Sequence, residues 1–171
     1  MRAMTRGRAF GMAIAGVALW VGGVDPGGLA AEPQSCTIEG ASAVAFGSYD
    51  PMTSSGVDVQ GQISYSCGKV GTVRQRGSGR AVHVQISLSP GLAGTFDRRM
   101  TGGRDVLRYN AYLDAARQII WGDGTGGTQV FTDATPPNGH LVTVPVFGRV
   151  FSGQDVGSGV YTDNLVVTLN F

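Results

Sequence analysis

The last eight residues of the chain, 164–171, alternate in side-chain character up to the final residue, which is an aromatic. Successive side chains of a β-strand point to opposite faces, so every second residue of this segment lies on one predicted face. That face carries Leu165, Val167, Leu169 and Phe171. An apolar strand with no polar tail after it has to be covered, either by its own fold or by another protein. The fold must therefore supply a partner for this strand or borrow one.

The N-terminal segment has the pattern of a secretory signal peptide. Residues 1–8 contain three arginines and no acid, and an apolar, Gly- and Ala-rich run follows over residues 9–24. That run is shorter than the roughly 20 residues that a membrane-spanning helix needs. We therefore predict that residues 1–30 are a signal peptide, with an uncleaved membrane anchor as the alternative.

Small residues after this run predict the cleavage site. Removal after Ala30 or Ala31 leaves residues 31–171, about 140 residues, which suit one domain with a substantial core. This part has ten Lys or Arg against eleven Asp or Glu, spread along its length, so its net charge is near −1. No patch attracts nucleic acid or an anionic membrane surface, and no stable membrane span is expected after processing.

The two cysteines of the chain, Cys36 and Cys67, both lie in the exported part. An even count behind a signal peptide predicts one disulfide, and two free thiols are the alternative. The bridge would be structural, because the chain has no CxxC motif typical of redox sites. Two cysteines and two distant histidines give no zinc-ligand cluster.

Short alternating or β-branched runs recur between glycine-rich turns, and helix signals are nearly absent, which predicts an all-β domain. The expected strands are residues 42–46, 61–67, 81–89, 106–113, 119–121 and 141–151, with a last strand region from 161 to 171. Pro145, inside one of them, indicates an edge or a bulge. About seven strands at this spacing predict an immunoglobulin-like β-sandwich, with a closed barrel as the alternative.

Catalytic and cofactor signals are weak. His83 falls on the solvent face of an expected strand and His140 in a loop, and neither has an acid or nucleophile pattern beside it. We therefore expect no enzyme activity, no catalytic residue, no metal site and no cofactor.

Two groups of residues have both a structural and a binding interpretation. Trp121 and Asp123 belong to a Trp-Gly-Asp-Gly segment that is typical of a β-turn, although an exposed Trp stacks on sugars and an Asp ligates calcium. Tyr109, Asn110 and Tyr112 would either form an adhesive surface or pack across the sheet, and packing is the favoured interpretation.

Several short segments occur in an order that resembles the spore coat protein U domain family. They are residues 46–51, 65–67, 99–100, 107–114, 121–124, 147–149 and 159–163. The resemblance covers essentially all of residues 36–171. That family is similar to the pilin subunits of the archaic chaperone-usher pathway.

The resemblance implies an incomplete immunoglobulin-like sandwich that is completed by a strand donated by another protein. The subunit would be exported to the periplasm and bound by a periplasmic chaperone. An outer-membrane usher and a neighbouring pilin subunit would then place it in a surface pilus or coat that serves adhesion and biofilm formation. In such pilins the C-terminal strand borders the acceptor groove. The positions carried over are Leu165, Val167, Leu169 and Phe171.

One departure from the pilin pattern concerns the donor segment. A polymerising pilin has ten or more residues of alternating apolar character before its first cysteine, whereas residues 31–35 here are Ala-Glu-Pro-Gln-Ser. We therefore expect a subunit that accepts a strand without donating one, at a pilus tip or outside polymerisation. The alternative function is a self-contained monomeric sandwich that binds carbohydrate or another surface ligand.

Overall fold

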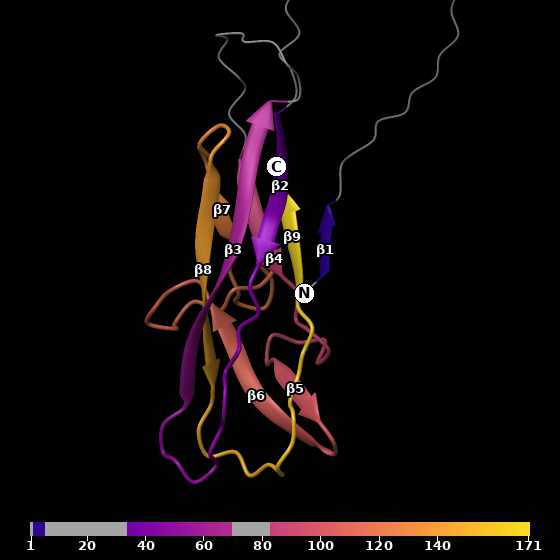
Figure 1. Ribbon diagram of the computed structural model, residues 1–171, viewed down its shortest axis with the longest axis vertical. Coiled ribbons are helices and arrows are strands. Elements are labelled where there is room, and N and C mark those ends of the chain that lie inside the picture. The colour runs from indigo at the N-terminus through magenta and orange to yellow at the C-terminus, as the bar shows by residue number, and fades with distance from the viewer. Residues whose placement is uncertain (1, 6–33, 70–82) are drawn as a thin grey trace, which may run out of the picture.

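The computed structural model describes residues 2–5, 34–69 and 83–171 (Figure 1). Within these ranges the secondary structure is strand, bridge and turn, without helix. The strands are β1 (Arg2–Thr5), β2 (Gln34–Ala41), β3 (Val57–Lys69), β4 (Val84–Leu88), β5 (Arg99–Gly102), β6 (Asp105–Tyr112), β7 (Phe131–Asp133), β8 (Leu141–Val150) and β9 (Val166–Asn170). No helix that could span a membrane occurs in the described ranges. The predicted cleavage site at Ala30 or Ala31 lies outside them.

The strands form two sheets that pack face to face as a sandwich. One sheet has the order β1-β9-β4-β7 and the other the order β2-β3-β8-β6-β5. All strand pairs are antiparallel except the pair of β1 with β9. The predicted all-β immunoglobulin-like sandwich is thereby confirmed, and the closed barrel is excluded because the sheets are separate.

The period-2 pattern of the sequence determines which side chains face the core. In β4 the buried positions Val84, Ile86 and Leu88 alternate with half-buried polar residues. In β9 the buried Val167 and Leu169 lie opposite Leu88 and Ile86 of β4, and they belong to the same core cluster. Side chains from both sheets thus form one apolar core around the fully buried Trp121.

The disulfide joins the first two strands of the larger sheet. Cys36 of β2 lies directly opposite Cys67 of β3 in the antiparallel register, with 4.1 Å between their Cα atoms. Both residues are buried in the main core. The predicted pairing is therefore the one that the structure contains.

Three expected strands differ from the observed ones. Residues 42–46 form no strand, because β2 ends at Ala41 and the chain then leaves β3. Residues 119–121 make only isolated bridges, Tyr112 with Ile120 and Trp121 with Gln129. The last strand starts at Val166, five residues later than expected. In each case the pairing is absent or limited to an isolated bridge, so no continuous ladder forms over the expected range.

Pro145 lies within β8 without interrupting it. Pro145 pairs with Gln62 of β3, whereas β6 pairs with β8 only from Phe147 to Val150. At Pro145, β8 therefore has a strand on one side only, which is the local edge position that a residue without an N–H requires.

A buried arginine, Arg98, connects the two sheets. Its Nη2 donates to the carbonyl oxygens of Ser89 at 2.8 Å and Trp121 at 2.7 Å, and its Nη1 donates to Oδ1 of Asn110 at 2.8 Å. Ser89 directly follows β4 of the smaller sheet, Asn110 belongs to β6 of the larger sheet, and Trp121 lies in the segment of isolated bridges after β6. Burial lowers the pKa of Arg98, because desolvation disfavours the charged form. The sequence gives no sign of this residue's role, since it reads as one of two adjacent arginines in a loop.

We predict that losing the disulfide lowers stability substantially. In the variant with Cys36→Ala and Cys67→Ala, a loop with a sequence separation of 31 is no longer closed in the unfolded chain. The free energy of unfolding should fall by about 3 to 4 kcal/mol on the chain-entropy model. Urea denaturation of the oxidised protein and the variant measures this, and equal midpoints would show that the bridge does not constrain the unfolded state.

A second prediction concerns Arg98. Arg98→Met keeps a long side chain but leaves the two carbonyl groups and Asn110 without their donor, so the free energy of unfolding should fall by roughly 3 kcal/mol or more. Arg99→Met is the matched control, because its side chain is 48% exposed. That variant should unfold within about 0.5 kcal/mol of the parent protein. Similar losses in both variants would contradict the role assigned to Arg98.

Candidate functional site

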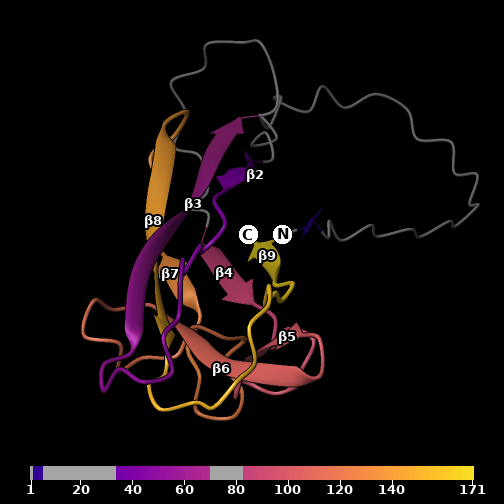
Figure 2. The ribbon, with the colours of Figure 1, turned by 60° about the horizontal axis from the view of Figure 1, so that its bottom comes forward.

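The larger sheet extends further than the smaller one. At the end where β3 begins and β8 ends, its inner face is covered by two irregular chain segments, residues 42–51 and 156–165. Figure 2 shows the second segment (yellow) passing in front of β6 on its way to β9. The space between the two segments is called the groove below.

The first groove wall has an unpaired backbone. The amide of Ser42 donates to the carbonyl oxygen of Gln62 at 2.9 Å, and this is the last ladder-type bond after β2. For residues 43–48 the described part of the chain provides no backbone hydrogen bond. Val44 and Phe46 are nonetheless half-buried while their neighbours are exposed, so the wall keeps a strand-like alternation.

Glycines in the sheet make room for this wall. A Cβ atom at Gly148 of β8 would lie 2.6 Å from Cγ1 of Val44 and 2.9 Å from Cε1 of Phe46. A Cβ at Gly61 of β3 would likewise lie 3.0 Å from Cγ2 of Val44. The ring of Phe46 also packs edge-on against Tyr109, with 5.6 Å between centroids. The wall is therefore seated on the sheet through side chains rather than through backbone hydrogen bonds.

The second wall changes sheets along its length. Thr162 exchanges two backbone hydrogen bonds with Thr101 of β5, at 2.9 and 3.0 Å, in the larger sheet. Four residues later β9 begins and pairs with β4 in the smaller sheet. Between these points Asp163 accepts hydrogen bonds from the Tyr109 hydroxyl at 2.7 Å and the Leu92 amide at 2.9 Å. Burial, and then this bond to Asp163, raise the pKa of Tyr109.

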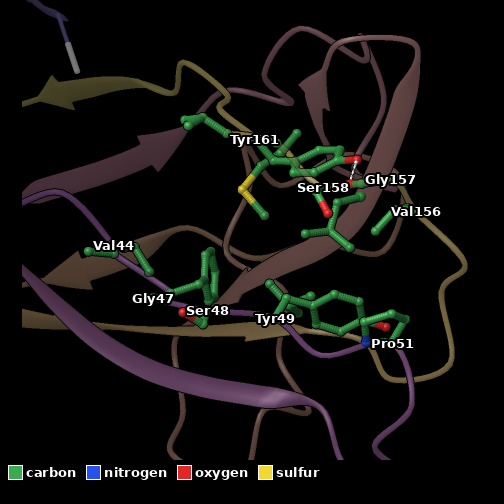
Figure 3. Close-up of a pocket in the computed structure, with 16 residues that line it drawn as sticks. Val44, Gly47, Ser48, Tyr49, Pro51, Val156, Gly157, Ser158 and Tyr161 are labelled. Atoms are coloured by element: carbon green, nitrogen blue, oxygen red, sulfur yellow. Dashed lines mark hydrogen bonds between the residues drawn. The ribbon is translucent and has the colours of Figure 1, made fainter.

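Two adjacent cavities lie between the walls. The lower one has a volume of about 570 Å³ and the upper one about 350 Å³. Figure 3 shows the lower cavity, with residues 44–51 on one side and residues 156–161 on the other. Both cavities are lined by Val44, Phe46, Met100 and Tyr161. The side chains beneath them come from β6 and β8 and include Leu107, Tyr109 and Val150. The groove thus has an apolar floor and a mixed polar and apolar lining, and its two cavities share four lining residues.

The four predicted edge residues follow the groove and then leave it. Leu165 lines the upper cavity. Val167 and Leu169 point into the main core beyond the groove, and both are almost fully buried. Phe171 is 48% exposed at the end of the chain. The outer edge of β9 pairs with β1 in parallel, from Arg2 opposite Val166 onward.

The wall and floor residues of the groove were not identified from the sequence as a site. Phe46, Met100, Leu107, Tyr109 and Tyr161 all belong to the short segments that carry the family resemblance. Their place in these segments was the one indication in the sequence that they form a site, because residues so far apart along the chain share no local pattern.

The ligand interpretation of Trp121 is wrong. Trp121 is fully buried, and its Nε1 donates to the carbonyl oxygen of Ile86 at 2.9 Å, so it presents no face to a sugar. Asp123 is exposed, and its Oδ1 accepts from both the amide and the hydroxyl of Thr125, which is a turn-forming arrangement. These bonds lower the pKa of Asp123.

The structure also shows which of the other candidate residues, the tyrosines and histidines, are buried and which are exposed. Tyr109, Asn110 and Tyr112 are all buried, which confirms the packing interpretation. His83 and His140 are both exposed. In the described ranges no three His, Cys, Asp or Glu residues gather as a metal site.

The fold resembles a known solved structure. A chain of the crystal structure of the CsuC-CsuE chaperone-tip adhesion subunit pre-assembly complex, from archaic chaperone-usher Csu pili of Acinetobacter baumannii, superposes with a TM-score of 0.53. Sequence identity is 19%, over 81% of this chain and 40% of the other. At this identity the similarity concerns the fold, and this chain spans less than half of its structural relative.

The sequence comparisons identify the family. "Protein U" of Myxococcus xanthus is 34% identical over 150 residues, which are 80% of this chain and 78% of that protein. The model of the Spore Coat Protein U domain matches residues 29–168. Those residues include both groove walls, the disulfide and most of β9. The chain therefore belongs to the Spore Coat Protein U domain family.

Proposed function

We propose that this protein is a structural subunit of an extracellular fimbria or surface coat, and that its groove accepts a β-strand from another polypeptide. The observation that carries the proposal is the unpaired backbone of residues 43–48 beside an apolar groove. Strand addition uses free main-chain groups for affinity and pockets for alternate side chains for specificity. The groove offers both.

The incoming strand would run from the lower cavity, through the upper cavity, to the outer edge of β9. Its inward side chains would fill the space lined by Val44, Phe46, Met100 and Tyr161. Along β9 its backbone would replace β1, whose residues belong to the predicted signal peptide. Since β1 would be removed by processing, the edge of β9 is left open in the exported chain.

The partners are proposed by analogy with the solved relative. The solved relative comes from a complex of a chaperone with a pilus tip adhesion subunit. By analogy, a periplasmic chaperone would supply the first strand, an outer-membrane usher would mediate export, and a neighbouring subunit would supply the final strand. Residues 31–171 would be the exported domain after removal of residues 1–30, and adhesion or biofilm formation would be the purpose of the assembly. A structural role requires no catalytic residue or cofactor.

The position in the assembly depends on the other end of the chain. Cleavage after Ala30 or Ala31 would leave about five residues before Cys36. Gln34 and Ser35 already pair with Lys69 and Gly68 in the ladder of β2 with β3. What remains is too short to act as a donated strand, so a tip or chain-terminating position is the one we propose.

The strand-accepting groove predicts that an added strand stabilises the domain. A strand of about ten residues with alternating apolar side chains, joined to Phe171 by a short turn, would lie antiparallel to β9 and fill the groove. The melting temperature of the exported domain should rise by about 10 °C or more, because several apolar side chains become buried. Thermal unfolding followed by circular dichroism measures the change.

The control is the same extension with serine at the inward-facing positions, which should give little stabilisation. If the unextended domain unfolds cooperatively at the same temperature as the extended one, the groove needs no added strand. The alternative of a self-contained monomeric sandwich would then hold.

The tip position predicts that the protein does not polymerise with itself. Purified exported chain, released from its chaperone, should remain monomeric on size-exclusion chromatography. A version carrying an alternating apolar donor segment before Ser35 should form linear multimers under the same conditions. Multimers of the parent chain would contradict the tip position while leaving strand acceptance intact.

A further inference from the structure

A second hollow lies on the opposite side of β6 from the groove. Leu107, Tyr109 and Ala111 of β6 face inward, whereas Arg108, Asn110 and Tyr112 line this outer hollow. Its volume is about 650 Å³, and its rim includes Asp97 from the loop before β5 and Thr125 from the loop after β6. Alternate residues of β6 thus face the two sites, although Asn110 lines both the outer hollow and the upper cavity of the groove.

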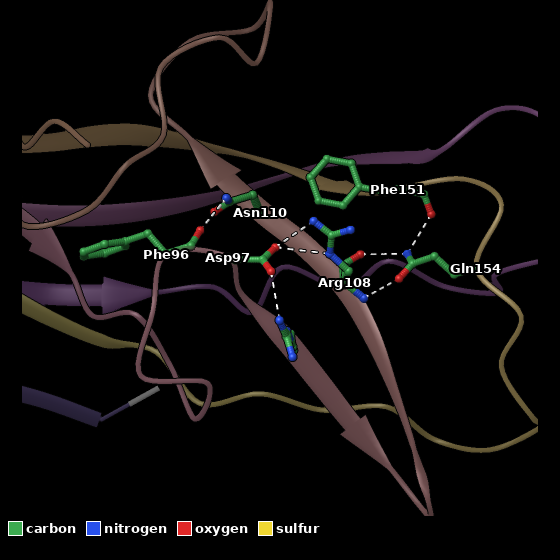
Figure 4. A network of polar contacts seen from close by, with 7 residues as sticks. Phe96, Asp97, Arg108, Asn110, Phe151 and Gln154 are labelled. Carbon is green, nitrogen blue, oxygen red and sulfur yellow. Dashed lines mark hydrogen bonds and ion pairs between the residues drawn. The ribbon is translucent and has the colours of Figure 1, made fainter. Parts of the chain in front are cut away.

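Aromatic rings flank the centre of the outer hollow. Figure 4 shows Phe96 and Phe151 on either side of the pair formed by Asp97 and Arg108. Both rings are half-buried, and the guanidinium of Arg108 lies 5.8 Å from the centroid of Phe151. Partly exposed rings beside polar groups provide a surface on which a sugar ring can stack while its hydroxyls are hydrogen-bonded.

The charge of the hollow is positive. Asp97 accepts from Nη2 of Arg108 and from Nη2 of Arg99, both at 3.0 Å, so two cations share one carboxylate. These hydrogen bonds, that from Arg99 first, lower the pKa of Asp97 and keep it ionised. Arg98, next to it, is buried against neutral acceptors. The ion-pair network of Arg99 and Arg108 with Asp97 therefore has one cation in excess, whereas Asp163 and Asp123 lie near the buried Arg98.

Arg108 has the capacity to bind a further acceptor. Its side chain is 57% exposed, and both of its side-chain hydrogen bonds within the described residues, from Nε and Nη2, go to Oδ1 of Asp97. In the described part of the chain its Nη1 has no hydrogen-bond partner. Its backbone is fixed separately, because Gln154 accepts from the Arg108 amide at 2.6 Å and donates to its carbonyl oxygen at 2.9 Å. Asp97 therefore holds the guanidinium and Gln154 holds the backbone of Arg108, while the Nη1 edge of the guanidinium remains available for a ligand.

We propose that the outer hollow binds an acidic saccharide, with a uronate carboxylate on Arg108 and the sugar ring against Phe96 or Phe151. A carboxylate is the group that a free guanidinium edge binds best. The open shape of the hollow suits one unit of an extended polymer rather than an enclosed small molecule. The proposal does not rest on strand acceptance in the groove.

The test compares charged and neutral sugars on the exported chain. Titration with a short oligogalacturonate, followed by calorimetry at low salt, should give saturable binding. A neutral galacto-oligosaccharide of equal length should bind at least about tenfold more weakly, and added salt should weaken the uronate binding. Equal binding of the two sugars, or no binding of the uronate, would overturn the proposal.

Variants assign the binding to this hollow. Arg108→Gln should weaken uronate binding about tenfold or more, in line with the loss of one charge-assisted hydrogen bond. Arg104→Gln removes the same charge from an exposed residue in the turn between β5 and β6 and should change affinity less than twofold. Arg108→Lys keeps the charge and should retain part of the affinity. Equal losses in Arg108→Gln and Arg104→Gln would show that only net charge matters, which refutes a defined site.

Discussion

The unequal length of the two sheets is the constraint from which the rest of the structure follows. β3 has 13 residues and β8 has 10, while β4 and β9 have five each and β7 has three. The smaller sheet therefore cannot cover the larger one, and an apolar face with Leu107, Tyr109 and Val150 extends beyond it. Two irregular segments cover this face, so its side chains are buried, but cavities of about 570 and 350 Å³ remain beneath and between the segments. A face covered by loosely packed segments instead of a strand is the physical basis of the groove.

The final segment of the chain meets this constraint by belonging to both sheets. Thr162 pairs with β5 in the larger sheet, and Val166 begins the strand that pairs with β4 in the smaller one. The change of sheet needs a fixed point, which Asp163 provides by accepting from Tyr109 below it and Leu92 beside it. Arg98 performs a comparable task nearby, because it connects the carbonyl groups of Ser89 and Trp121. Polar anchors thus hold the walls in place where ladder hydrogen bonds are missing.

Alternation of apolar and polar residues was sufficient to predict the sandwich and much of its core, because this pattern can be recognised from residues that are neighbours in the sequence. Residues 61–67 and 106–113 became strands for this reason. The same pattern in residues 42–46 gave no strand, because pairing depends on a partner that local sequence does not reveal. The sequence left open whether Trp121 is exposed to a ligand, because its burial depends on contacts such as that with Ile86, which is 35 residues away. The groove shows the same limit: Leu165 was found from its own strand, whereas Phe46 and Met100 meet only in the folded chain.

β6 lies between the groove and the outer hollow. Its inward residues are apolar and meet the groove, where the free energy of association would come from burying another strand. Its outward residues are polar or amphipathic, and Arg108 among them remains in water. A side-chain change at Arg108 therefore leaves the groove lining intact, while a change at Tyr109 alters both the floor of the groove and the anchor at Asp163. If the groove accepts a strand and the hollow binds a saccharide, as proposed, residues for the two roles can change largely separately, because a β-strand presents its alternate residues to separate environments.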